Sequence, residues 1–157
     1  MLVIGGGPDG ESPRTIAEGY GFQCVITPGD ILAAHPKIWP APHSYSSAHA
    51  RPLPQDCKIA AIMMFSNPLD WGPVLQIIID LLLSQNGQLG TRSAKNGDTA
   101  LPNSGYLQDG QPMVYFSGSD LCWTSEYPVP RFGFGSFRVS IPEQAQAKAS
   151  SMQDTVC

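Results

Sequence analysis

Charge is what this sequence lacks most. Asp, Glu, Lys and Arg make up 14% of its 157 residues, against about 25% in a typical soluble protein. Glycine and proline are correspondingly frequent, with 16 and 15 residues, which predicts a few apolar elements joined by long loops. The net charge of −4 argues against a basic face, so we expect no binding to nucleic acid or to an anionic membrane.

Long apolar runs are also missing. The longest, Val74–Leu83, is interrupted by two polar residues and is too short to cross a bilayer. Met1 is followed directly by the apolar Leu2-Val3-Ile4, which is not the pattern of a signal or transit peptide. These absences predict a protein without membrane insertion and, on this ground alone, a cytoplasmic one.

Metal-binding and disulfide patterns are absent as well. The four cysteines form no C-x-x-C pair and three lie in or beside apolar stretches, so buried reduced thiols are expected. Three histidines and one cysteine lie near each other, but their spacing matches no zinc template, and no metal site is predicted. The residues concerned are His35, His43, His49 and Cys57 for zinc, with Cys24, Cys122 and Cys157 as the other thiols.

The motifs of self-sufficient enzymes are missing too. The chain has no G-x-S-x-G nucleophile elbow, no G-x-x-x-x-G-K-S/T phosphate loop and no D-x-D carboxylate pair. We therefore assign no catalytic residue from the motifs.

What is present is a recurring strand-helix-strand pattern. Leu2-Val3-Ile4 reads as a strand, Ser12-Pro13 as a helix start and Gly21 as its end, and Cys24–Thr27 as a second strand. Asp30 is expected to cap a short helix through residue 34. A helical crossover between strands implies that the two strands are parallel.

A second unit follows a proline-rich linker, in which we place a domain boundary near residue 50. Strands are predicted at 59–65 and 113–116, with a helix between them from Asp70 to about Ser84 and a polar loop at 91–110. The pattern indicates an α/β fold with parallel pairing.

Glycines after the first strand form Gly5-x-Gly7-x-x-Gly10, with Asp30 about twenty residues later. This is formally the dinucleotide fingerprint, in which the acid binds ribose. Pro8 removes one amide from the cradle, and the helix begins beyond the third glycine. A plain βα turn is favoured, and a dinucleotide-binding fragment is kept as an alternative.

Two further segments are candidate ligand contacts. Ser117–Asp120 follows a buried strand, where ligands bind in open α/β sheets, so Asp120 either contacts a polar substrate or belongs to a capped turn. Arg131, with Gly133 and Gly135, fits an anion site. The same segment fits equally well an aromatic strand through Val139 in which the glycines reduce crowding.

Several segments, in order along the chain, carry a family resemblance. The most specific is Asn67-Pro68-x-Asp70-Trp71 followed by the run 75–84. The others are Glu18–Phe22 leading into Val25–Pro28, then Ile38–Pro40, and Pro130–Phe137. Together they span most of residues 2–138. They resemble the haloacid dehalogenase (HAD) superfamily, subclass IIA, in the eukaryotic branch typified by the cat eye syndrome critical region protein 5.

The resemblance implies an architecture and an activity. Residues 1–50 would be part of a Rossmann-like core, residues 51–140 a C2-type α/β cap domain, and residues 141–157 a divergent, disordered tail. Members of this family hydrolyse small phosphate monoesters, with an attacking aspartate, a second aspartate as acid/base, and Mg²⁺ as cofactor. The resemblance further implies mitochondrial location and a link to glycerophospholipid metabolism.

The chain departs from the family at its reactive residues. The D-x-D-G motif would lie upstream of Met1, and nothing after Arg138 resembles the family's Lys motif or its Mg²⁺-binding acids. We therefore expect a fragment, inactive alone and without a cofactor of its own, that carries the cap. By resemblance, substrate-binding residues would be Asp120, Arg131, Gly133 and Gly135, although Gly118-Ser119 stand where the family commonly has Asn-Pro. A stand-alone binding or regulatory module is the other alternative.

Overall fold

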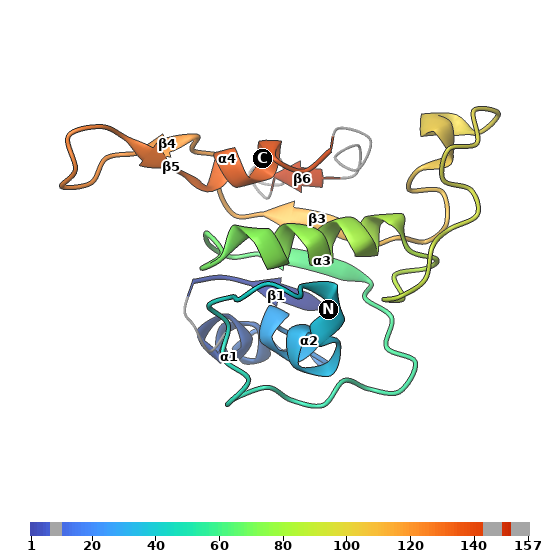
Figure 1. The fold of residues 1–157 in the computed structure, drawn as a ribbon, viewed down its shortest axis with the longest axis horizontal. Helices are drawn as coiled ribbons and strands as arrows, with labels where there is room; N and C mark the ends of the chain where they lie inside the picture. The colour runs from blue at the N-terminus through green and yellow to red at the C-terminus, as the bar shows by residue number, and fades with distance from the viewer. Residues whose placement is uncertain (7–10, 143–148, 152–157) are drawn as a thin grey trace.

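A four-stranded parallel sheet organises the chain (Figure 1). The computed structural model describes residues 1–6, 11–142 and 149–151. The strand order is β1-β2-β3-β6, with β1 at Leu2–Ile4, β2 at Ala61–Met64, β3 at Met113–Phe116 and β6 at Ala149–Ser151, and each neighbouring pair is parallel. The predicted α/β class with parallel pairing is confirmed.

Successive side chains of a strand point to opposite faces of the sheet, so buried residues form a cluster on each face. Residues in register across three strands, such as Ile4, Met64 and Phe116, are fully buried and pack with helix α3 (Trp71–Leu83). Val3 points to the opposite face and clusters with Ala17 of helix α1 (Glu11–Gly19). Helices on both faces explain why β1 can be apolar at every position.

Helix α1 ends as the sequence predicts, because Gly21 has a φ of +85°. The amide of Phe22 bonds back to the carbonyl of Ala17 at 3.2 Å, which closes the last turn. The strand expected at Cys24–Thr27 is shorter than predicted. Only an isolated parallel bridge joins Ile26 to Leu2, since Thr27 already begins the next helix.

That next helix, α2 (Pro28–Ala34), corrects a second detail. Its N-cap is Thr27, not Asp30. The Thr27 hydroxyl accepts from the Asp30 amide, and the Asp30 carboxylate accepts from the Thr27 amide at 2.8 Å, which forms a reciprocal capping box. Asp30 therefore lies inside the first turn and its carboxylate turns back toward the protein interior.

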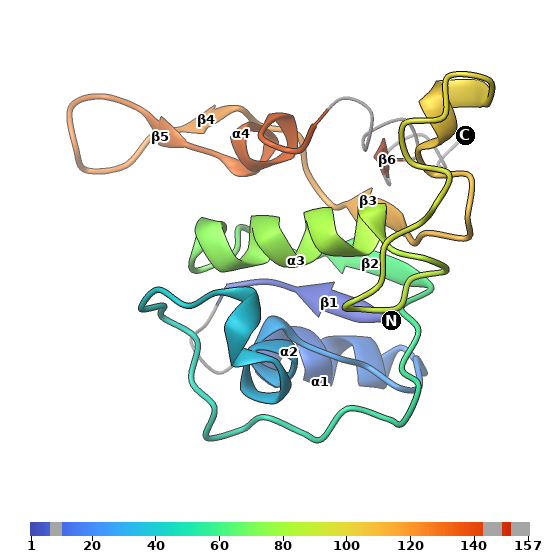
Figure 2. The ribbon, with the colours of Figure 1, turned by 45° about the vertical axis from the view of Figure 1, so that its right-hand side comes forward.

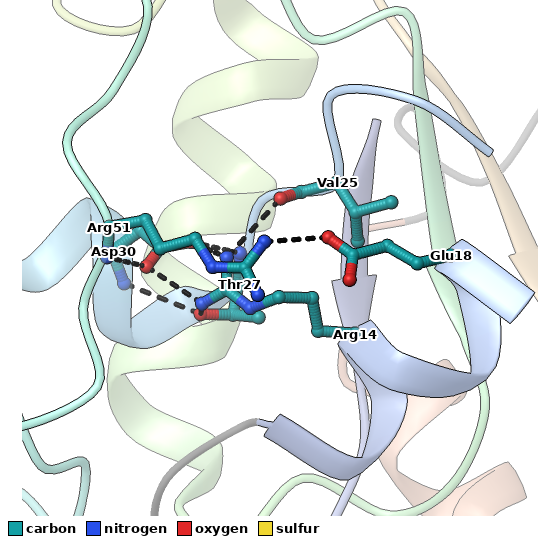
Figure 3. Close-up of polar contacts among 6 residues, drawn as sticks. All are labelled: Arg14, Glu18, Val25, Thr27, Asp30 and Arg51. Carbon is teal, nitrogen blue, oxygen red and sulfur yellow. Dashed lines mark hydrogen bonds and ion pairs between the residues drawn. The ribbon is translucent and has the colours of Figure 1, made fainter.

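Asp30 also forms a buried ion pair with Arg14, and both side chains are 1% exposed (Figure 3). The two guanidinium nitrogens reach the two carboxylate oxygens at 3.1 and 3.0 Å. The backbone amide of Arg51 donates to the same carboxylate at 2.6 Å. The pair thus ties α1, α2 and the segment that leads to β2 to one another.

Removing one partner of this pair should be costly. We expect Asp30→Asn to lower the free energy of unfolding by about 3–5 kcal/mol, because it leaves a guanidinium buried without a counter-charge. Urea unfolding followed by circular dichroism measures this. The matched control is Glu18→Gln, which removes the exposed ion pair of Glu18 with Arg51 and should cost no more than about 1 kcal/mol. Equal losses in both variants would contradict the assignment.

In the second half of the chain, the strands and the helix lie close to the positions predicted from the sequence. β2, α3 and β3 all form, and Asp70 is the N-cap of α3. The Asp70 side chain does not cap the helix, however. It accepts from the amide of Ser44 at 3.2 Å and so holds the proline-rich segment against the helix. In that segment burial raises the pKa of Tyr45, whose ring is 6% exposed.

The strands on either side of the predicted boundary near residue 50, β1 and β2, pair in one sheet. The proline-rich segment between them contains the short 3-10 helix η1 (Pro36–Ile38), and the loop 91–110 contains η2 (Pro102–Gly105). The division of the chain into core and cap stays a prediction.

A small antiparallel hairpin extends away from the sheet in both views (Figures 1 and 2). It consists of β4 (Cys122–Trp123) and β5 (Arg131–Phe132). The expected aromatic strand through Val139 is wrong beyond Phe132, because residues 134–139 form helix α4 (Phe134–Val139). A helix lets Phe137 meet Trp71 edge-on at 5.2 Å while it is fully buried. Of the predicted tail, residues 143–148 and 152–157 lie outside the described residues.

The thiols differ from the expected burial. Cys24 and Cys122 are free and exposed, and Cys57 is half-buried. Cys122 lies on the exposed strand β4, where its apolar neighbours Leu121 and Trp123 are exposed as well. Cys157 lies outside the described residues. Burial raises the pKa of the Cys57 thiol.

Alkylation should report this pKa. Since the thiolate is the reactive form, the midpoint of the pH–rate profile for Cys57 with iodoacetamide should lie higher in the folded chain than in urea. Peptide mass spectrometry resolves Cys57 from the other thiols. A folded midpoint equal to or below the unfolded one would contradict the burial effect.

Candidate functional site

Polar residues gather where the first three parallel strands end. These carboxyl-edge residues are Gly5 and Gly6 after β1, Ser66 and Asn67 after β2, and Ser117 and Gly118 after β3. The amide of Gly6 donates to the Ser66 hydroxyl oxygen at 2.8 Å, and the Ser117 hydroxyl donates to the carbonyl of Phe65 at 2.7 Å. The carboxyl ends of parallel strands are where ligands bind in open α/β sheets.

Gly5 allows this edge to close tightly. A Cβ atom on Gly5 would lie 2.6 Å from Cγ of Pro13 and 3.2 Å from the Ser66 hydroxyl oxygen. Only a residue without a side chain therefore lets the start of α1 and the end of β2 approach β1 so closely. The first glycine of the fingerprint is thus explained by packing.

Among the carboxyl-edge residues, Asn67 has a side-chain acceptor that is not hydrogen-bonded. Its Oδ1 atom is buried and has no hydrogen-bond partner among the described residues. An acceptor left in this state costs free energy as long as no donor reaches it. Asn67 is not among the site residues that the sequence motifs predict. The signal available was its place directly after a continuous apolar strand and before Pro68.

Asp120 lies two residues beyond the carboxyl edge. Its side chain is exposed, and no hydrogen bond or ion pair joins its carboxylate to another residue that the structure describes. Its backbone carbonyl accepts from the amide of Gly135 at 2.9 Å. The carboxylate is thus free to meet a ligand, while the backbone serves the packing of α4. The substrate-binding role of Asp120 stays a prediction.

Arg131 lies on the exposed strand β5 and is held within its own hairpin. The guanidinium carbon is 4.4 Å from the ring centroid of Tyr127, and Nε donates to the carbonyl of Val129 at 3.3 Å. No ion pair between Arg131 and Asp120 is present. The two predicted charged contacts therefore come from neighbouring parts of the chain without touching each other.

Gly133 and Gly135 have a packing role in this structure. A Cβ on Gly133 would lie 2.3 Å from the carbonyl oxygen of Asp120, and one on Gly135 would lie 2.1 Å from that of Ser119. The two glycines let α4 lie directly against the segment that follows β3. Contact with a ligand stays a prediction for both.

A methyl group at this approach should be poorly tolerated. We expect Gly135→Ala to lower the free energy of unfolding by about 1–3 kcal/mol, because the backbone must move to relieve the overlap. Gly19→Ala is the matched control, since a Cβ there meets nothing within 4 Å. Chemical denaturation of both variants tests this, and a Gly135→Ala protein as stable as the control would contradict the packing role.

The acidic residue of the dinucleotide fingerprint, Asp30, already has partners within the protein. Both oxygens of the Asp30 carboxylate are engaged with Arg14, the Thr27 amide and the Arg51 amide, and the side chain is 1% exposed. It is therefore not available to a ribose hydroxyl. Gly7 and Gly10 of the fingerprint lie outside the described residues.

Metal and membrane features can be assessed for residues 1–6, 11–142 and 149–151. No group of three or more His, Cys, Asp or Glu side chains there could hold a metal ion. None of the helices in this part is long and apolar enough to cross a bilayer.

Together the fold and the candidate site define an α/β protein with polar residues at the carboxyl edge of its sheet and no reactive constellation among the residues described. No model of a known protein family matches the chain. The chain is 37% identical over 138 residues to "Mitochondrial hydrolase YKR070W" of Saccharomyces cerevisiae. The matched region covers 83% of this chain and 36% of that protein.

A second relative is the "Cardiolipin synthase (CMP-forming) / mitochondrial hydrolase fusion protein" of Schizosaccharomyces pombe. It is 36% identical over 147 residues, which is 88% of this chain and 22% of the fusion protein. The chain thus spans about a third and about a fifth of these two proteins. Both are named as mitochondrial hydrolases, which supports the hydrolase resemblance and the mitochondrial location that it implied.

Proposed function

We propose that this chain is the substrate-recognition portion of a mitochondrial phosphate monoester hydrolase of the HAD type, subclass IIA. The observation that carries the proposal is the similarity, over more than four fifths of the chain, to proteins named as mitochondrial hydrolases. The parallel sheet with a polar carboxyl edge supports it. That edge supplies hydrogen-bonding groups for a small polar ester rather than a nucleophile.

The chemistry of the described residues fits binding better than bond cleavage. The edge presents the buried Asn67 acceptor, and the exposed Asp120 carboxylate follows it. The Ser117 hydroxyl donates to a backbone carbonyl, and no hydrogen bond to a histidine or carboxylate that would activate it as a nucleophile is present in the described part. We infer that the chain orients substrate while a segment outside it supplies the attacking group.

Mg²⁺, which the HAD type implies, does not fit the described residues. A Mg²⁺ site needs carboxylate oxygens that converge with substrate phosphate, and no cluster of acids is present in the part of the chain that the structure describes. No step is therefore assigned to a metal bound here. Any such ion would be held by residues outside the described ones.

A chimera tests the proposal. The chain replaces the matching segment of the S. cerevisiae relative, and hydrolysis of p-nitrophenyl phosphate with Mg²⁺ is measured. We expect no turnover by the chain alone, turnover by the chimera, and a raised KM with little change in kcat for Asp120→Asn in the chimera, because ground-state binding is lost.

Three results would contradict this proposal. They are turnover by the pure chain, a parent yeast protein that does not hydrolyse the ester, and a folded but inert chimera of an active parent. The matched control is Asp56→Asn, a change at an exposed turn that precedes β2, whereas the carboxyl-edge residues follow the strands.

A second candidate, a non-catalytic binding module, is favoured by the hairpin. Its aromatic side chains are unusually exposed, at 52% for Trp123 and 74% for Phe132. Exposed apolar side chains gathered on one element are typical of a protein-binding surface. This candidate gains support where the chimera is inert and the chain alone is a cooperatively folded protein.

A further inference from the structure

A second polar site lies outside the carboxyl-edge residues. A cavity of about 570 Å³ is formed by the end of α2, the 3-10 helix η1, the second half of α3 and the turn at residues 89–90. This is the size range of small-molecule sites. Its lining includes the titratable side chains of His35, Lys37 and Asp80, none of which belongs to the carboxyl edge.

Asp80 is an unexpected residue at this place. It is the one charged residue of α3, a helix that is otherwise apolar apart from Gln76. It is only partly exposed, and the Gln76 side-chain amide donates to its Oδ1 at 2.7 Å. That bond fixes the carboxylate and leaves Oδ2 without a hydrogen bond to any residue that the structure describes. A fixed, partly desolvated carboxylate is a strong acceptor for a cation.

Lys37 contributes the opposite charge from another wall of the cavity. It is exposed, and no ion pair joins it to Asp80 or to another acid in the described ranges. His35 lies two residues before it. Two opposite charges therefore line one cavity without an ion pair between them, so each could pair with a group of a ligand bound there.

The rest of the cavity wall is apolar. Ile38 and Leu89, both partly buried against the core, and Ala34 and Pro36 line it. A ligand that reaches from the carboxylate to the ammonium group would therefore pass apolar side chains, whose contact favours a hydrocarbon link.

We propose that this cavity binds a small linear zwitterion, in which an ammonium group pairs with Asp80 and an anionic group pairs with Lys37 across an apolar spacer. The site is separate from the proposed hydrolase function, and its test has no activity readout. Binding of such a molecule couples α2 and η1 to α3.

The ω-amino acids from 3-aminopropanoate to 6-aminohexanoate probe the site on the intact chain, with pentylamine and pentanoate as half-ligands. Calorimetry or ligand-observed NMR should show a maximum of affinity at one chain length. The best zwitterion should bind at least about tenfold more tightly than either half-ligand, since each charged hydrogen bond contributes independently.

Two isosteric or near-isosteric variants assign the ends. Asp80→Asn keeps an acceptor for Gln76 and should reduce affinity for the best zwitterion to that for pentanoate, with pentanoate binding unchanged. Lys37→Met should reduce it to the level of pentylamine, with pentylamine binding unchanged. A variant that merely misfolds would lose both half-ligands, so retention of one of them separates loss of a contact from loss of the fold.

The proposal is overturned by any of three results. One is the absence of measurable zwitterion binding. Another is equal binding of zwitterion and half-ligands, which would mean that only one charge is used. The third is binding that both variants leave unchanged. Lys95→Met, at an exposed lysine that does not line this cavity and donates to the carbonyl of Gln108 instead, is the control and should bind like the original chain.

Discussion

The buried pair of Arg14 and Asp30 is the interaction on which the first half of the structure depends. Burying two charges costs several kcal/mol each unless their hydrogen-bonding capacity is met. Here the carboxylate is shared among a guanidinium and two backbone amides, and the guanidinium also reaches the carbonyl of Val25 at 3.4 Å and the Thr27 hydroxyl at 3.4 Å. These partners come from three separated parts of the chain, namely α1, residues 25–30 and the segment before β2, so a shift of any one part would break hydrogen bonds to a buried charge.

That constraint positions the carboxyl edge of the sheet. Arg14 ties α1 to residues 25–30, and Ile26 of that segment bridges to β1. Pro13, the neighbour of Arg14, lies close enough to Gly5 that no side chain fits there. The end of β1 then meets the end of β2 through the bond from the Gly6 amide to Ser66. The site is therefore built by strand ends that the packing of α1 brings together, with Asn67 left holding a buried acceptor.

Much of the architecture was predictable from local pattern. The apolar runs at β1, β2 and β3 are continuous and of strand length, and the run at α3 is interrupted only by Gln76 and Asp80. The parallel pairing follows from the helical crossovers. The predictions of secondary structure fail where the same residues fit two kinds of local structure. Thr27 fits the pattern of a strand but caps α2. The aromatic pattern after Phe132 also fits a strand, but Phe137 reaches the core from a helix.

The sequence by itself determined the class of the fold and the elements that build its edge, because hydrophobic periodicity and turn residues act over a few neighbours. Only the tertiary structure decided what the polar residues do. It shows Asp30 as a buried counter-ion and not a ribose contact, gives Gly133 and Gly135 a packing role, leaves the Asn67 acceptor without a partner, and brings Asp80 and Lys37 to the lining of one cavity. A polar side chain is defined by the partner that it meets, and that partner is usually far away in the sequence.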